Sequence, residues 1–274
     1  MGTTGRRARL ELRDSTVLIT GATGGIGGAI ARALARRGAR LVLSGRRADA
    51  LEPLERELTA RTVVADLADR DDVDRLAAEA ARAGVDVFIA NAALPASGHL
   101  LELTQEQIDR MLEVNLRAPI ALARALAPGM TARGRGHMVF VSSLSGKAAS
   151  PASSVYSATK FGLRGFALGV RQDLRAHGVG VSVLAPGFIR DAGMFADADV
   201  RLPPGVGTRS PGDVAAAVVR AIERNRAEVD VAPVGLRVGA AFGAVAPGAA
   251  AVAGRLLGSD RIATAMSEGQ RGKR

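Results

Sequence analysis

The stretch from residue 16 to residue 27, TVLITGATGGIG, decides the fold of this chain. It begins with an apolar run, Thr16–Thr20, that is typical of a strand buried on both faces. Glycines at positions 21, 25 and 27 follow, and a helical pattern begins at residue 25. A strand, a glycine-rich turn and a helix in this order predict the first unit of an α/β domain.

The same alternation of apolar runs and helical patterns continues along most of the chain. Further strands are predicted at 41–44, 62–65, 85–90, 137–142, 179–184 and 228–232. Helices are predicted at 25–37, 49–59, 70–83, 104–133, 154–176 and 211–225. Because such alternation implies right-handed crossovers, we predict a single α/β domain with three layers, doubly wound, around a mainly parallel seven-stranded sheet. The proline- and glycine-rich stretch 190–210 is predicted to be a long loop, which often serves as a lid.

The composition fits one large domain and excludes several kinds of site. The chain has 274 residues, of which 47% are apolar but only 3% aromatic, so small aliphatic residues must fill the core. Cysteine is absent, which excludes disulfides, zinc fingers, iron–sulfur centres and thiol catalysis. The three histidines, at 99, 137 and 177, lie far apart, so we expect no metal site.

The two ends of the chain are expected to lie outside the domain proper. We predict a flexible tail at 1–14, the domain at 15–233 and a C-terminal extension at 234–274. The first residues have no apolar run of the signal-peptide type, so we expect a cytoplasmic protein. Residues 1–14 carry a net charge of +2 and residues 255–274 one of +3, which is half of the total of +10. We therefore expect no nucleic-acid interface.

An uncharged segment at 238–254 is rich in alanine and glycine. It lies at the short end of the length that spans a membrane. We predict that it packs against the domain or a second subunit, and contact with a membrane surface is the alternative.

The glycine-rich turn predicts a dinucleotide site. Its glycines permit a tight turn, a close approach of backbone to phosphate and close packing of the helix on the strand. The start of the helix adds free N–H groups and a partial positive charge. The residues predicted to hold the pyrophosphate are Gly21, Thr23, Gly24, Gly25, Ile26 and Gly27.

The end of the second predicted strand favours one form of the cofactor. A carboxylate at this place would pair with the ribose 2′-hydroxyl of NAD, but the chain has Gly45, followed by Arg46 and Arg47. A guanidinium group matches the geometry of a 2′-phosphate. The sequence therefore favours NADP(H), with NAD(H) possible. The alternative is that the two arginines only begin a solvated helix.

Two further strand ends are predicted to line the cofactor. Asp66, followed by Leu67, ends the third strand, where its carboxylate can accept a hydrogen bond from the adenine amino group. The alternative for Asp66 is a helix cap or a turn. Asn91 and Ala92 end the fourth strand, where small residues let the chain pass beneath the cofactor.

A serine, a tyrosine and a lysine predict the chemistry. Tyr156, the single tyrosine of the chain, and Lys160 are four residues apart and share a helical face. Because an ammonium group favours the phenolate, the pair is a candidate general acid/base. Ser143 ends the fifth strand at the same edge of the sheet, where its hydroxyl can hydrogen-bond a substrate oxygen. The alternative is a core tyrosine beside a surface lysine.

Taken together, these motifs resemble the short-chain dehydrogenase/reductase family over residues 14–230. The resemblance implies a Rossmann-fold oxidoreductase that moves a hydride between the nicotinamide and a carbonyl or secondary alcohol. It implies that Tyr156 passes the proton, that Lys160 binds the nicotinamide ribose and lowers the tyrosine pKa, and that Ser143 polarises the reacting oxygen. It further implies a homodimer or homotetramer, formed through the long helices at 104–133 and 154–176.

The resemblance also assigns residues outside these motifs. Asn115 would hold a water in a proton relay from Lys160. The nicotinamide would be lined by Pro186, Gly187 and the backbone of Ile189.

The chain departs from the family pattern at two places. The family commonly has glycine where this chain has Ala93, which could crowd the floor of the site. It usually has threonine where this chain has Asp191, an acid that needs a partner such as Arg190 near a pyrophosphate.

The apolar residues around the predicted site suggest its substrate. These candidates for substrate contact are Leu94, Leu144, Phe188, Met194 and Phe195. They favour a hydrophobic small molecule, although the same residues could merely seal the loop against the core. Two other functions remain open, a non-catalytic NADP(H)-binding regulator and a membrane-surface-associated reductase of lipid-like substrates.

Overall fold

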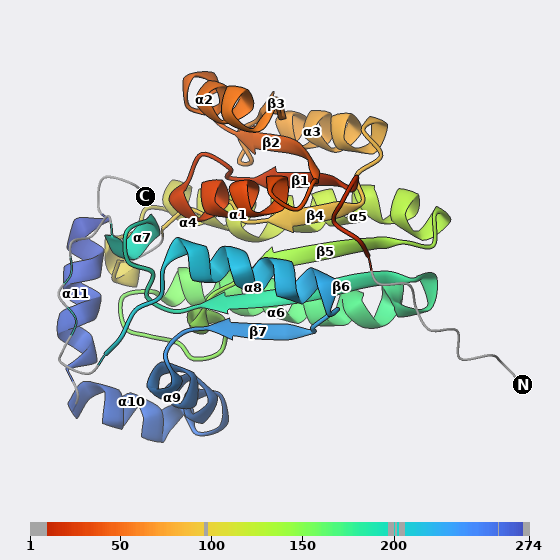
Figure 1. The fold of residues 1–274 in the computed structure, drawn as a ribbon. Coiled ribbons are helices and arrows are strands. Elements are labelled where there is room, and N and C mark those ends of the chain that lie inside the picture. Colours follow the sequence, from red (N-terminus) through yellow and green to blue (C-terminus); the bar gives the residue numbers. More distant parts are fainter. Residues whose placement is uncertain are drawn as a thin grey trace, which may run out of the picture.

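The strands form one parallel sheet, which confirms the predicted fold class. The computed structural model describes residues 10–95, 98–196, 200, 202, 206–256 and 258–270. The strands are β1 (Thr16–Thr20), β2 (Arg40–Gly45), β3 (Arg61–Val64), β4 (Val87–Ala90), β5 (Gly136–Val141), β6 (Val179–Pro186) and β7 (Glu228–Val231). They lie in the order β3-β2-β1-β4-β5-β6-β7, and every pairing is parallel (Figure 1). The order reverses between β1 and β4, the place where open α/β sheets bind their ligands.

Helices cover both faces of this sheet and so make three layers. The main helices are α1 (Gly25–Ala35), α2 (Ala48–Leu58), α3 (Arg70–Arg82), α4 (Gln105–Leu112), α5 (Ala118–Ala132), α6 (Ser154–Leu174) and α8 (Pro211–Glu223). One buried cluster takes its helical residues from α1, α2 and α8, and the other from α3 to α6. Each predicted helix is present, with ends shifted by a few residues.

Residues of the central strands alternate between the two buried clusters. In β1, Val17 and Ile19 pack with α1 and α8, whereas Leu18 packs on the opposite side. All three are fully buried, which explains why the three central residues of TVLIT are apolar. Edge-to-face contacts between aromatic rings, such as that of Phe88 with Phe140 at 6.1 Å between centroids, compensate for the scarcity of aromatics.

The long helix predicted at 104–133 contains a feature that its pattern does not reveal. A π-helical turn, η2 (Glu113–Arg117), joins α4 to α5. Such turns are rare and are frequent at functional sites. Here the turn contains Asn115, which is fully buried.

Packing begins before residue 15. Leu12 is buried and belongs to the cluster that includes α1 and α8, so residues 10–14 are not wholly a free tail. The rest of the predicted tail, residues 1–9, lies outside the described residues. The stretch 190–210, expected as a loop, includes the short helix α7 (Gly193–Ala196) and a bridge between Ile189 and Arg209.

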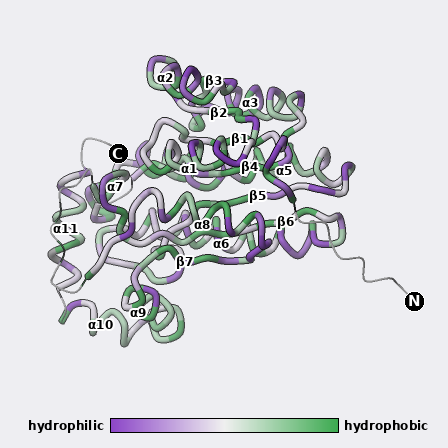
Figure 2. Tube along the Cα trace, viewed as in Figure 1, coloured by the Kyte–Doolittle hydropathy of each residue, from purple (hydrophilic) through white to green (hydrophobic). Residues whose placement is uncertain are grey.

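The C-terminal extension is helical. It forms α9 (Val234–Val245), α10 (Pro247–Leu256) and α11 (Ser259–Gly269) at one end of the sheet (Figure 1). The uncharged segment 238–254 is thus broken between α9 and α10, and Figure 2 shows apolar residues along both. Within the described residues, no helix combines the length and apolarity needed to cross a membrane.

Candidate active site

The glycine-rich turn has the geometry that its sequence predicts. Gly21 has a φ of +65°, and a Cβ there would lie 2.7 Å from the Cα of Ala92. The side-chain nitrogen Nδ2 of Asn91 donates hydrogen bonds to the backbone carbonyls of Thr20 and Gly21, at 3.1 Å each. The side chain of Asn91 therefore clamps the turn to the end of β4.

The start of α1 carries no side chain that competes with an anion for its N–H groups. Its N-cap is Gly24, no side chain caps it, and no acidic residue lies in its first turn. The first N–H groups of such a helix lack partners within the helix and attract negative charge. This arrangement suits the pyrophosphate of a dinucleotide.

The segment after β6 closes over this turn. A Cβ on Gly25 would meet the Cβ of Ala192 at 2.2 Å, so the start of α1 and the segment after β6 are in close contact. Asp191, at the position where the family pattern has threonine, has a φ of +66°. Its carboxylate lies 3.4 Å from Nε of Arg190, the partner that the sequence suggested.

The end of β2 places two arginines beside the turn. A Cβ on Gly45 would lie 3.2 Å from Cγ2 of Thr23, so this strand end is packed directly against the turn. Arg46 and Arg47 are exposed. Within the described residues, their guanidinium groups make no hydrogen bond or ion pair.

The carboxylate of Asp66 already has partners. It accepts hydrogen bonds from the backbone N–H of Ala68 at 3.0 Å and from Arg110 at 2.8 Å. Burial opposes its ionisation, but these two donors outweigh burial and hold the pKa of Asp66 below its ordinary value. Each oxygen can accept a further bond, so a ligand amino group could still be recognised. Leu67 is buried in the core, and its predicted contact with the cofactor stays a prediction.

Ser143 and Tyr156 meet above the carboxyl end of β5. The Ser143 hydroxyl accepts a hydrogen bond from the N–H of Ser145 at 3.1 Å and lies 3.5 Å from the carbonyl oxygen of Pro186. Burial raises the pKa of Tyr156 to about 12, and a side-chain hydrogen bond with Ser143 acts in the opposite direction. The phenol is therefore protonated at neutral pH.

Lys160 is buried beside the tyrosine ring. Its Nζ donates to the carbonyl of Val141 at 3.0 Å and lies 5.6 Å from the centre of the Tyr156 ring. Burial lowers the pKa of Lys160 to about 8. In the protein alone, burial of the phenol dominates the pKa of Tyr156. The expectation that Lys160 lowers this pKa stays a prediction.

Asn115 binds the chain that leaves β4. Its Oδ1 accepts from the N–H of Leu94 at 2.7 Å, and its Nδ2 donates to the carbonyl of Leu94 at 3.0 Å. The π-helical turn thus fixes the segment that follows Asn91 and Ala92. These contacts do not test the predicted water relay, which stays a prediction.

Two residues that hold the turn carrying Ser143 are not predicted from the sequence. The hydroxyl of Ser142 donates to the carbonyl of Lys160 at 2.9 Å. Gly146, in the 3-10 turn η3 (Leu144–Gly146), lies so close that a Cβ would meet Oγ of Ser142 at 2.5 Å. The signal was the run Ser142-Ser143, of which only the second residue was assigned a role.

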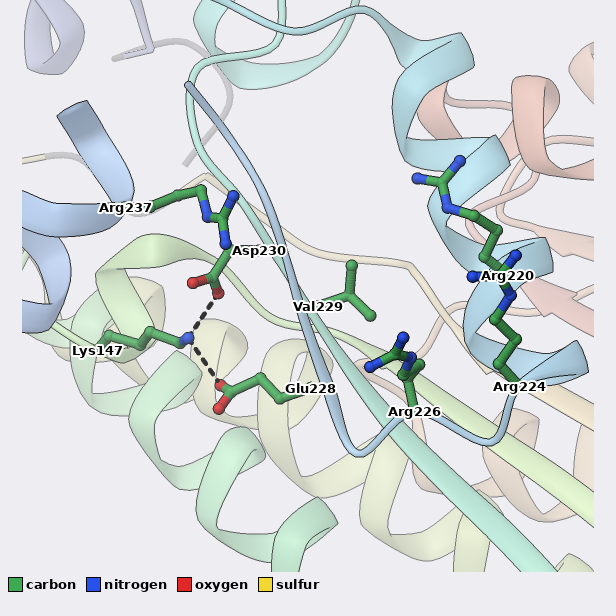
Figure 3. Close-up of a pocket in the computed structure, with 8 residues that line it drawn as sticks. All are labelled: Lys147, Arg220, Arg224, Arg226, Glu228, Val229, Asp230 and Arg237. Atoms are coloured by element: carbon green, nitrogen blue, oxygen red, sulfur yellow. Dashed lines mark hydrogen bonds and ion pairs between the residues drawn. The ribbon is translucent and has the colours of Figure 1, made fainter. Parts of the chain in front are cut away.

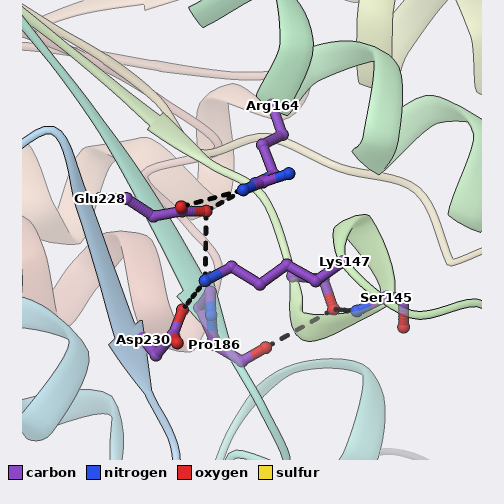
Figure 4. Close-up of polar contacts among 7 residues, drawn as sticks. Ser145, Lys147, Arg164, Pro186, Glu228 and Asp230 are labelled. Atoms are coloured by element: carbon purple, nitrogen blue, oxygen red, sulfur yellow. Dashed lines mark hydrogen bonds and ion pairs between the residues drawn. The ribbon is translucent and has the colours of Figure 1, made fainter. Parts of the chain in front are cut away.

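An ion network anchors the same turn to the edge of the sheet. Lys147, which follows η3, lies 2.5 Å from Asp230 and 3.3 Å from Glu228 (Figure 3). Arg164 of α6 binds Glu228 with two hydrogen bonds, at 2.7 and 3.1 Å (Figure 4). The turn that carries Ser143 is therefore tied to both α6 and β7.

The predicted substrate residues differ in what they contact. The rings of Phe188 and Phe195 are 5.0 Å apart between centroids. A Cβ on Gly187 would contact Leu144 at 3.2 Å, so Leu144 faces the start of the same loop. Leu94 is buried in the core, and the side chain of Met194 lies outside the described part of the structure.

Comparison with known proteins finds similar sequences and structures. A family model described as short chain dehydrogenase matches residues 15–201. Dehydrogenase/reductase SDR family member 7B of Bos taurus is 34% identical over 249 residues, which cover 82% of this chain and 76% of that protein. Ketoacyl reductase HetN of Nostoc sp. is 36% identical over 227 residues, covering 80% and 79%. The structure of a short-chain dehydrogenase from Sphingobium yanoikuyae in complex with NADPH superposes with a TM-score of 0.75, at 29% identity, covering 84% of this chain and 93% of that one.

Proposed function

Because this chain belongs to the short-chain dehydrogenase/reductase family of oxidoreductases acting on CH–OH and C=O groups, we propose that it uses NADP(H) and that Tyr156 is its general acid/base. The observation that carries this proposal is the meeting of Ser143, Tyr156 and Lys160 at the carboxyl ends of the strands, on the edge that bears the glycine-rich turn. The alternative of a core tyrosine beside a surface lysine does not fit, because Lys160 is only 2% exposed.

The cofactor would be held by the turn and the two arginines. The N–H groups at the start of α1 would bind the pyrophosphate, and Arg46 and Arg47 would bind the 2′-phosphate. Neither guanidinium group makes a hydrogen bond or an ion pair among the described residues, which supports this role, although the charge of Arg46 helps to lower the pKa of Asp66. When bound, the nicotinamide would donate or accept the hydride.

Side chains of the protein would orient the substrate and transfer the proton. Ser143 would donate a hydrogen bond to the reacting oxygen and hold it beside the phenol. In the reducing direction, Tyr156 would give its proton to that oxygen as the alcohol forms, and in the oxidising direction it would take the proton back. Lys160, with its ammonium over the ring, would favour the phenolate that forms.

We further propose that the substrate is a hydrophobic ketone, aldehyde or secondary alcohol. Phe188, Phe195 and Leu144 present apolar surface next to the turn that carries Ser143. Residues of this kind gain free energy by removing apolar substrate surface from water.

A screen of carbonyl compounds tests these proposals. Oxidation of NADPH would be followed by absorbance with hydrophobic ketones and with small polar sugars, in the wild type and in Tyr156→Phe. We expect turnover of the hydrophobic compounds, lost in the variant while NADPH binding is kept. NADPH binding with no turnover in the wild type would favour a non-catalytic regulator instead.

A homo-oligomer is also proposed. Leu112 at the end of α4 and Phe161 of α6 are 38% and 41% exposed, on the two long helical regions expected to form subunit contacts. Sedimentation analysis of the full chain would test this, and a monomer at micromolar concentration would overturn it.

A further inference from the structure

A pocket lies at the outer edge of the sheet, along β7, the last strand in the sheet order. Its volume is about 390 Å³, and its walls come from α8, β7, α9 and the residue after η3 (Figure 3). Alternate residues of β7 face opposite sides of the strand in this view. Glu228 and Asp230 lie on the side of Lys147, and Val229 lies on the side of α8.

The acidic groups of this pocket are already neutralised. Glu228 and Asp230 share the ammonium of Lys147, and Glu228 also binds Arg164 (Figure 4). Two carboxylates thus face two cations in one closed network. No negative charge is left over for the other basic residues of the pocket.

Four arginines in the wall remain without a counter-charge. Arg220 and Arg224 are one turn apart on α8, Arg226 follows that helix, and Arg237 lies on α9 across the strand (Figure 3). Within the described residues, none of the four makes an ion pair or a side-chain hydrogen bond. Like charges gathered around one pocket repel one another, and an anion bound in the pocket would relieve the repulsion.

The chemistry of the pocket matches phosphate. A guanidinium group binds phosphate oxygens through two parallel hydrogen bonds, and four such groups would serve more than one phosphate. The volume of about 390 Å³ lies within the range of small-molecule sites, roughly 300–1,000 Å³. We propose that this pocket binds linked phosphate groups.

Two sources could supply such a group. One is an oligophosphate compound in solution, and the other is the headgroup of an anionic phospholipid. A phospholipid fits the outward face of α9 beside Arg237, because this face is apolar. Its residues Val234, Val238 and Phe242 are 67%, 62% and 48% exposed. The phosphate chemistry is common to both.

Calorimetric titration with inorganic pyrophosphate tests the pocket. The full chain would carry Arg46→Gln, Arg47→Gln and Gly24→Asp throughout. An aspartate at the N-cap of α1 suits the helix and repels pyrophosphate from the glycine-rich turn, so the proposed cofactor site does not contribute. Adding Arg220→Gln and Arg224→Gln should weaken pyrophosphate binding at least tenfold. The matched control is Arg124→Gln, an exposed arginine on α5, which should leave binding unchanged. Circular dichroism would verify that each variant is folded.

Three results would overturn the proposal. They are undetectable pyrophosphate binding, equal affinity with and without Arg220 and Arg224, and equally tight binding of sulfate at the same ionic strength. Flotation with vesicles of cardiolipin, whose headgroup joins two phosphates through glycerol, and phosphatidylcholine then identifies the source. Flotation that needs cardiolipin and both arginines assigns a lipid headgroup, and pyrophosphate binding without flotation assigns a soluble oligophosphate.

Discussion

The hydroxyl of Ser142 donates a hydrogen bond to the backbone carbonyl of Lys160, 18 positions further along the chain, at 2.9 Å. Both residues are buried, and the bond joins the end of β5 to the middle of α6. Because Ser143 follows Ser142 directly, this one contact sets the position of Ser143 relative to the helix that carries Tyr156 and Lys160. Ser142 is thus a positioning residue for the proposed catalytic group.

Replacing Ser142 by alanine should harm both stability and turnover. The Lys160 carbonyl would lose its buried partner, which costs about 1–3 kcal/mol of unfolding free energy. Misplacement of Ser143 should lower kcat by at least about tenfold, with a smaller change in KM. Urea denaturation and steady-state kinetics would measure these effects. Ser145→Ala, in the same turn, is the control, since its described hydrogen bond to Ser143 uses the backbone N–H.

The pH dependence of the two reaction directions should differ. Burial raises the pKa of Tyr156 to about 12 and lowers that of Lys160 to about 8. The phenol is therefore protonated and ready to donate over the neutral range, so the reduction rate should change little between about pH 6 and pH 8. Oxidation needs the phenolate and should rise with pH over the same interval.

Initial rates with NADPH and a ketone, and with NADP and the corresponding alcohol, would measure both profiles. A reduction rate that falls steeply across this interval would contradict the protonated phenol. Tyr156→Phe should remove the pH-dependent rise in oxidation together with most of the activity.

Arg46 should distinguish the two nicotinamide cofactors. Removing its guanidinium group by Arg46→Ala should weaken NADPH binding by about tenfold or more, because a charge-assisted hydrogen bond is worth roughly 1.5–3 kcal/mol. NADH, which lacks the 2′-phosphate, should bind with unchanged affinity. Fluorescence titration would give both dissociation constants. Arg56→Ala, which removes an exposed arginine of α2 paired with Glu52, is the control. An equal loss for both cofactors would contradict the assignment.

The sequence predicts the fold well because its signals are local. The apolar runs from Thr16–Thr20 onward and the glycines at 21, 25 and 27 specify strands and a turn through backbone requirements alone. The positions of Ser143, Tyr156 and Lys160 follow from the rule that parallel strands end at one edge of the sheet.

The rest depends on contacts between distant segments. The π-helical turn at Asn115 keeps an ordinary helical pattern, so nothing in residues 104–133 reveals it. The raised pKa of Tyr156 arises from burial, which a sequence motif does not report. Likewise, the arginines of α8 and α9 are typical solvated residues in sequence, and only the fold gathers them around β7.

His137 should make the protein less stable in mild acid. Burial, with a smaller contribution from Arg171, lowers the pKa of this histidine to about 3, and its Nε2 lies 2.8 Å from the hydroxyl of Ser182. In the unfolded chain the pKa is about 6.5, so below that pH the unfolded state binds a proton that the folded state excludes. The contribution of the neutral histidine to the unfolding free energy is therefore complete above about pH 6.5 and is lost as the pH falls toward 3. The loss is about 2 kcal/mol between pH 7 and pH 5.

Urea unfolding at pH 7 and at pH 5 would measure this loss. The difference in unfolding free energy between the two pH values should be smaller for His137→Gln than for the wild type, because glutamine does not titrate. His177→Gln, at an exposed histidine, is the control and should match the wild type. The same loss in both variants would mean that His137 titrates in the folded protein as it does in the unfolded chain.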